Sequence, residues 1–187
     1  VDGSAESCGA IVDFVLPTAS DNCGAGKNVL LIWDVLNSNT TSLMNSLTTA
    51  GFLVTLSATS ETGYNGSNPS LDGFEAVIHL NGTTFSEGMT LDGQNALIDF
   101  VLNKGKMYIT DEWSAYEVEQ GTMREMSDIV VLNRTSGFDS NVTYTQVSQQ
   151  LTHPILASVP SSFVLPRAGG NVGLARVYQS NQPIVLM

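Results

Sequence analysis

Basic residues are scarce in this sequence. Lys and Arg together number 7, against 18 Asp and Glu, so the 187 residues carry a formal net charge of −11. Nucleic acids and anionic membranes attract proteins through positive charge, and neither is an expected partner here. The longest strongly apolar run covers only residues 29–33, far short of the about 18 residues of a membrane span, so membrane insertion is not expected either.

Cysteine is nearly absent, and its two occurrences are close together at Cys8 and Cys23. In a chain rich in Ser, Asn and Gly, this spacing suggests a disulfide that closes a loop of about 15 residues and adds roughly 3 kcal/mol to stability. Two free thiols in a reducing compartment are the alternative. Between the cysteines lies a short apolar strand that ends at Pro17; its apolar residues are Ile11, Val12, Phe14, Val15 and Leu16. We therefore expect residues 1–26 to form a stapled strand extension outside a main domain of residues 27–187.

Charged residues make up only 13% of the chain, about half the usual share. Ser, Thr, Asn and Gly replace them, as is typical of extracellular surfaces. The sequence also holds five Asn-x-Ser/Thr triplets, the acceptors of N-linked sugar in secreted proteins. They lie at Asn39, Asn65, Asn81, Asn133 and Asn141. These features predict an extracellular glycoprotein.

Hydrophobic patterning predicts an α/β fold with a mostly parallel sheet and helices on both faces. Expected strands alternate with helices; the strands cover residues 29–34, 52–56, 75–80, 106–110 and 128–132, and the helices cover residues 41–50, 91–103 and 115–126. The last third is less regular, with expected strands at 143–147 (antiparallel), 162–165, 174–178 and 183–187. Because the chain stops inside the last of these, we expect it to belong to a longer polypeptide.

Two resemblances to known families accompany this pattern. Residues 27–34, 73–78, 97–113 and 153–156 resemble the class I glutamine-amidotransferase-like group, in its non-enzymatic extracellular branches, which implies a flavodoxin-like fold. Residues 8–24 resemble the edge of a HYR-type adhesive repeat, through Cys8, Val-Asp-Phe at 12–14 and Pro-Thr-Ala-Ser-Asp-Asn-Cys-Gly at 17–24. The rest of that module is missing, which leaves a lone stapled strand.

The sequence lacks the residue patterns that nucleophilic catalysis needs. The resemblance implies a catalytic Cys directly after the strand at 106–110, but Asp111-Glu112-Trp113 stands there and residues 24–187 contain no Cys. Ser114 is not in a Gly-x-Ser-x-Gly turn, and a pair with His153 would need a third, orienting acid. His79 lies within an expected strand and is predicted to be a core residue. The expectation is a protein that is not an enzyme.

Three carboxylates, those of Asp34, Asp111 and Glu112, follow expected strands at the same sheet edge. Such groups are candidate ligands for Ca²⁺ or Mg²⁺, whereas the favoured interpretation is that they cap helices. We therefore expect no cofactor, with Ca²⁺ as the one alternative. Trp33 and Trp113 are predicted to be core residues rather than sugar-stacking platforms.

Four of the acceptors follow expected strands, at the carboxyl edge where ligands bind in open α/β sheets. Asn39, Asn65, Asn81 and Asn133 follow the first, second, third and fifth of these strands. The alternative is that longer loops lie on that edge and give more chance for a triplet. The leading hypothesis is a secreted structural protein of a cell surface or fibre, which self-assembles head to tail through residues 10–16 or binds other surface proteins. A sugar- or calcium-binding adhesin module and a degenerate amidotransferase-like hydrolase are the alternatives.

Overall fold

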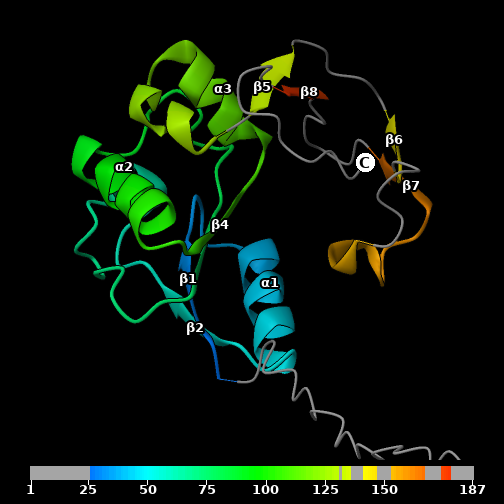
Figure 1. Ribbon diagram of the computed structural model, residues 1–187, viewed down its shortest axis with the longest axis horizontal. Helices are drawn as coiled ribbons and strands as arrows, with labels where there is room; N and C mark the ends of the chain where they lie inside the picture. Colours follow the sequence, from blue (N-terminus) through cyan, green and yellow to red (C-terminus); the bar gives the residue numbers. More distant parts are fainter. Residues whose placement is uncertain (1–25, 131, 136–140, 147–152, 167–173, 178–187) are drawn as a thin grey trace, which may run out of the picture.

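A four-stranded parallel sheet forms the centre of the molecule (Figure 1). The computed structural model describes residues 26–130, 132–135, 141–146, 153–166 and 174–177. The strands lie in the order β2-β1-β3-β4 and comprise β1 (Asn28–Ile32), β2 (Leu53–Leu56), β3 (Ala76–His79) and β4 (Met107–Thr110). Leu30 of β1 pairs with Thr55 on one side and Val77 on the other, so β1 and β3 are central. The predicted parallel α/β architecture is confirmed.

One face of the sheet is covered by α1 (Ser38–Thr49). Val29, Leu31 and Ile78 point to this face, where Leu43, Met44 and Leu47 of the helix pack against them. The helix begins at Asn37, whose side-chain Oδ1 accepts hydrogen bonds from the backbone N–H groups of Asn39 and Thr40. It ends before Gly51, which has a φ of 94° that favours glycine.

The opposite face carries the larger core. It is covered by α2 (Leu91–Ile98), its π-helical continuation η2 (Asp99–Asn103), α3 (Glu112–Gln120) and the short helix η3 (Arg124–Asp128). Leu97, Phe100 and Val118 from these elements belong to one buried cluster with Leu30, Ile32 and Val77 of the sheet. The alternation of side chains along β1 thus serves two cores, which explains its continuous apolar run.

The prediction of a fifth parallel strand at residues 128–132 is wrong. Residues 124–128 form η3, and Val130 is buried against the core from a turn, so its apolar character reflects burial without strand pairing. Two antiparallel pairs follow instead: β5 (Leu132–Thr135) with β8 (Leu174–Val177), and β6 (Asn141–Thr145) with β7 (Ser162–Pro166). The short helix η5 (Pro154–Leu156) lies between β6 and β7.

Both edges of the parallel sheet present apolar side chains to solvent. Leu53 on β2 and Met107 on β4 are 57% and 59% exposed. The expected N-terminal extension, with Cys8, Cys23 and the strand at 10–16, lies outside the described residues, as does the strand expected at 183–187. Within the described ranges, no helix combines the length and apolarity needed to cross a membrane.

Candidate functional site

A crevice lies at the carboxyl edge of the sheet, where the strand order reverses between β1 and β3. The chain leaves β1 through α1 to reach β2 on one side, while β3 pairs on the other side, and ligands of open α/β sheets bind outside such a switch point. The crevice measures about 270 Å³. Its walls come from the loop after β1, the start of α1 and the ends of β3 and β4; the lining residues are Asp34, Val35, Asn37, Asn39, Thr40, Leu43, Leu80, Asn81 and Asp111.

The two aspartates of the crevice hold its loops together. Asp34 Oδ2 accepts a hydrogen bond from Thr83 N at 2.7 Å, and its Oδ1 accepts one from Thr84 Oγ1 at 2.8 Å. Asp111 caps α3 by accepting from Trp113 N at 3.0 Å and also accepts from Asn81 N at 2.9 Å. Burial raises the pKa of Asp111, while these backbone donors oppose the rise.

The helix-capping interpretation is therefore confirmed for Asp111, and Asp34 fastens the loop after β3. Glu112 sits in the first turn of α3, where a negative charge complements the helix dipole. The described residues contain no group of three His, Cys, Asp or Glu side chains placed to hold a metal ion.

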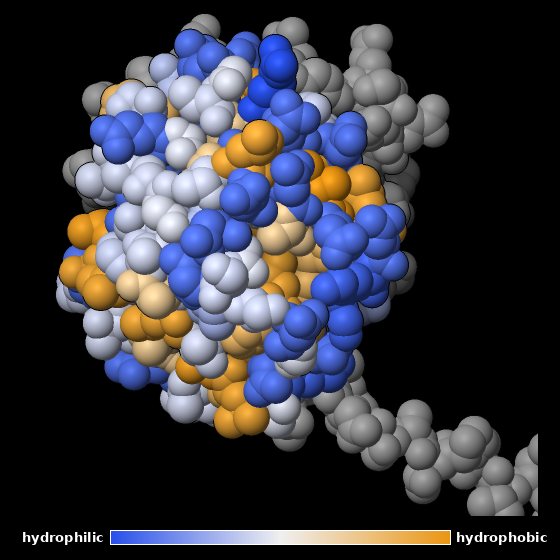
Figure 2. Space-filling model, turned by 90° about the vertical axis from the view of Figure 1, so that its left-hand side faces the viewer, coloured by the Kyte–Doolittle hydropathy of each residue, from blue (hydrophilic) through white to orange (hydrophobic). Residues whose placement is uncertain are grey.

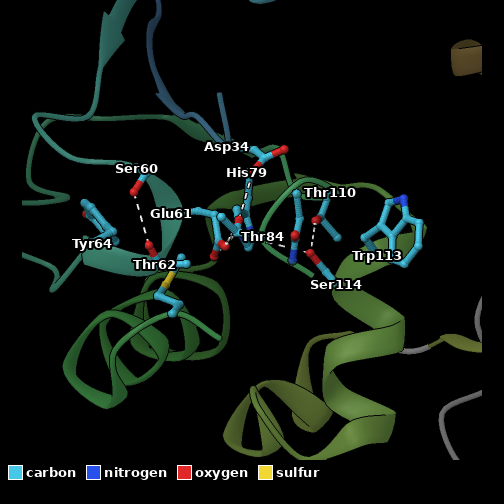
Figure 3. Close-up of polar contacts among 12 residues, drawn as sticks. Asp34, Ser60, Glu61, Thr62, Tyr64, His79, Thr84, Thr110, Trp113 and Ser114 are labelled. Carbon is cyan, nitrogen blue, oxygen red and sulfur yellow. Dashed lines mark hydrogen bonds and ion pairs between the residues drawn. The ribbon is translucent and has the colours of Figure 1, made fainter. Parts of the chain in front are cut away.

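Beneath the crevice lies a buried polar network around His79 (Figure 3). His79 Nδ1 is 2.8 Å from the hydroxyl of Tyr108 and 3.5 Å from Ser114 Oγ, while its Nε2 is 3.5 Å from Glu61 Oε2. Thr84 Oγ1 joins Glu61 Oε1 to Asp34, at 2.6 and 2.8 Å. The prediction that His79 is a core residue is confirmed, since its side chain is fully buried.

Ser114, His79 and Glu61 are the three residue types of a serine hydrolase, but their geometry does not suit catalysis. All three are fully buried, so no substrate reaches Ser114 Oγ. The shortest contact of Ser114 is Thr110 Oγ1 at 2.5 Å, and the shortest contact of His79 is Tyr108. A nucleophile and its base approach within about 3.2 Å at an accessible position. In the structure the histidine near Ser114 is His79, whereas the pair considered from the sequence was Ser114 with His153.

Glu117 was missed by sequence reasoning and is the most perturbed acid of this network. It is fully buried on α3, and neither carboxylate oxygen has a hydrogen bond partner within 3.5 Å. Burial raises the pKa of Glu117 to about 8, the negative charge of Glu61 adds to the rise, and the nearby amide of Asn81 opposes it. The only signal in the sequence was the position of Glu117 beside Val118 on the inward side of α3.

Three aromatic side chains gather near the crevice. Trp113 lies 5.1 Å from Phe85 and 5.6 Å from Tyr116, measured between ring centroids. Phe85 is 41% exposed, and Trp113 is half-buried. Trp33 is also half-buried and donates its indole N–H to Ser57 O at 2.9 Å. The expectation of two core tryptophans is therefore wrong in degree, because both residues are only partly buried.

The five predicted acceptors occupy different environments. Asn39, Asn65 and Asn141 are exposed. Asn81 is only 8% exposed, and its Nδ2, the atom that would carry sugar, is enclosed, which disfavours it as an acceptor in this fold. Asn133 lies within β5 instead of following a strand of the parallel sheet, so its expected place at the crevice edge is wrong. Glycosylation itself stays a prediction.

Comparisons with known proteins support the fold. No protein-family model and no curated protein matches the sequence. Among solved structures, a ThuA-like protein from Bacteroides uniformis ATCC 8492 matches with a TM-score of 0.55 and 15% sequence identity, over 84% of this chain and 62% of that protein. The chain thus spans less than two thirds of the length of that protein. The match agrees with a flavodoxin-like, class I glutamine-amidotransferase-like fold.

Proposed function

We propose that this chain is a non-enzymatic, N-glycosylated structural domain of an extracellular surface or fibre. One observation carries the proposal: the position of the expected nucleophile is occupied by the cap of α3, and the Ser114–His79–Glu61 group behind it is sealed from solvent. Such a network stiffens the carboxyl edge of the sheet. A polar group buried in this way contributes to a unique packing without any reaction.

The exposed acceptors support the glycosylated part of this proposal. Asn39 lies in the first turn of α1, and Asn65 lies in a turn after the short helix η1 (Glu61–Gly63). Asn65 Oδ1 accepts hydrogen bonds from Ser67 N at 3.0 Å and from Ser67 Oγ at 2.8 Å. These bonds use the oxygen of the side chain and leave its nitrogen, the atom that joins sugar, on the other side of the amide.

Head-to-tail assembly through residues 10–16 belongs to the same proposal. An edge strand with unpaired backbone groups and apolar side chains is a template for strand addition. β4 is an edge strand of the parallel sheet, and Met107 and Ile109 on it are exposed. A strand from a second copy that pairs there would form a heterologous contact, which propagates into an open filament.

An intact-mass measurement tests glycosylation. The chain, secreted from a eukaryotic host, is weighed before and after enzymatic deglycosylation. We expect a loss of mass, and we expect Asn39→Gln and Asn65→Gln each to remove one glycan. Asn81→Gln is the matched control, because its enclosed nitrogen is expected to carry none. An unchanged mass in the unsubstituted chain would contradict the proposal.

A turnover assay tests the absence of catalysis. We expect no hydrolysis of a panel of amide and ester substrates above the solvent rate, by the unsubstituted chain or by Asp111→Asn, Glu112→Gln and Ser114→Ala. Turnover that disappears in Ser114→Ala would overturn the non-enzymatic assignment. Turnover that persists in Ser114→Ala but disappears in either acid variant would overturn it as well.

Sugar binding is a second candidate function, favoured by the aromatic group at Phe85, Trp113 and Tyr116. Aromatic faces beside carboxylates and amides suit neutral sugars, because the ring stacks on apolar C–H groups while polar groups receive the hydroxyls. A glycan array, followed by fluorescence titration of Trp113, tests it. Calorimetry with Ca²⁺ tests the calcium-dependent form of the same hypothesis.

A further inference from the structure

Asn39 stands at the mouth of the switch-point crevice. It is one of the crevice-lining residues, its side chain is exposed, and its backbone N–H is held by Asn37 Oδ1 at 2.8 Å. The other acceptor that lines the crevice, Asn81, has its nitrogen enclosed. A glycan on Asn39 therefore starts at the rim of the crevice, whereas Asn65 lies outside the crevice lining.

The crevice has the size and surface of a site for a neutral sugar ring. Its volume of about 270 Å³ is just below the range of about 300–1,000 Å³ that holds drug-sized ligands. Val35, Leu43 and Leu80 supply apolar walls for the C–H face of a ring. The negative charges of the two aspartates at the crevice disfavour an anionic ligand, so a neutral ligand is the better candidate.

Polar groups of the crevice have unused hydrogen-bonding capacity. Asp34 and Asp111 each accept two hydrogen bonds, although a carboxylate offers about four acceptor positions. The hydroxyls and the amide N–H of N-acetylglucosamine are donors that these carboxylate oxygens can accept.

We propose that the first N-acetylglucosamine of a glycan on Asn39 folds back into this crevice and closes it. The inference rests on the glycosylation proposed above. The covalent link keeps the sugar at an effective concentration in the millimolar range, so contacts too weak to bind free sugar suffice. The site at which a related fold would place a ligand is then filled by the protein's own modification.

Hydrogen exchange of the glycosylated chain tests this inference. The amides of Asn81 and Thr83, which donate to Asp111 and Asp34, report on the crevice. We expect about two- to tenfold slower exchange of these amides in the glycosylated chain than in Asn39→Gln. Trimming every glycan to its first sugar with an endoglycosidase should preserve the protection. Asn65→Gln is the matched control and should leave both amides unchanged.

The outcomes separate this inference from the proposed function. A glycan on Asn39, shown by mass, with the same exchange in Asn39→Gln and the unsubstituted chain, overturns the crevice inference and leaves glycosylation intact. Equal slowing by the Asn65 glycan also overturns it, because the effect is then a general one of attached sugar. Absence of a glycan from Asn39 while other acceptors are occupied refutes the inference alone, and absence from all of them refutes both proposals.

Discussion

At the scale of single residues, the notable feature is a set of acids buried without full hydrogen bonding. Glu61 and Glu117 are fully buried, and each has at least one oxygen with no hydrogen bond partner. Burial favours the neutral form of a carboxyl group, and a second negative charge nearby favours it further. Glu117 therefore holds its proton at pH values where an exposed glutamate has lost it.

Replacement of Glu117 tests this arrangement through the pH dependence of stability. The folded pKa of about 8 exceeds the ordinary value of 4.5, so raising the pH between these values favours unfolding. This group lowers the free energy of unfolding by about 1.4 kcal/mol for each pH unit in that window. Glu117→Gln, which is always neutral, should flatten this decline in urea titrations at pH 5 and pH 8.

Glu119→Gln is the matched control for this substitution. Glu119 is exposed and lies two residues further along α3, so its replacement should leave the pH dependence as it is in the unsubstituted chain. The same decline with pH in Glu117→Gln and Glu119→Gln would show that Glu117 ionises normally in the folded protein.

At the scale of secondary structure elements, the polar residues after the strands begin the helices and shape the crevice at once. Asn37 caps α1, Thr90 caps α2 and Asp111 caps α3. Two of these three caps, Asn37 and Asp111, also line the crevice. Residues that look like candidate catalytic groups because they line the crevice, Asn37 and Asp111, thus serve to accept hydrogen bonds from the first N–H groups of helices.

Replacement of Asp111 tests its structural role. Asp111→Ala removes the acceptor of Trp113 N and of Asn81 N, and we expect a loss of about 1–2 kcal/mol in the free energy of unfolding. Asp111→Asn keeps a side-chain oxygen at the cap and should retain most of that stability. Urea denaturation at pH 7 measures both.

Asp92→Ala provides the comparison, since Asp92 is an exposed acid in the first turn of α2 that does not cap it. Its loss should cost only about 0.3–1 kcal/mol, through the helix dipole. If Asp111→Ala were no more damaging than Asp92→Ala, the capping role of Asp111 would be refuted.

At the scale of the whole molecule, apolar side chains remain exposed, some of them on the edge strands of the parallel sheet. Figure 2 shows apolar patches between hydrophilic side chains on one face of the molecule, and Leu53, Met107 and Ile109 expose apolar side chains on the two edge strands. A protein that uses such an edge needs a partner strand of matching character. Residues 10–16 have that character, because five of these seven residues are large and apolar.

Deletion of residues 1–24 tests assembly. We expect the shortened chain to remain folded and monomeric, because the parallel sheet and both of its cores lie within the later residues. The full chain should form larger species in light scattering after size-exclusion chromatography. A variant with Ile11, Val12 and Phe14 replaced by Ser keeps the chain length and should also be monomeric. Assembly that survives in both forms would contradict the proposed contact.

The sequence predicted most of the parallel sheet but not the end of the domain. Apolar runs at residues 29–33 and 76–78 pointed to the central strands, since strands covered on both faces of a parallel sheet have such runs. The run at 128–132 has the same character, yet Val130 is buried from a turn. An apolar run shows that a segment is buried, but it does not show whether that segment is a paired strand or an unpaired one. That outcome depends on whether a partner strand is within reach.

Composition and local pattern alone determined the class of fold, the acceptor triplets, the lack of a thiol nucleophile and the excess of negative charge. These properties depend on residue type and short-range order, which the chain carries before it folds. Only the tertiary structure decided that His79 joins Ser114 to Glu61, that Asn81 is enclosed while Asn39 opens onto the crevice, and that Glu117 is buried. Each of these facts depends on contacts between distant segments, and such contacts exist only once the strands have set the loops side by side.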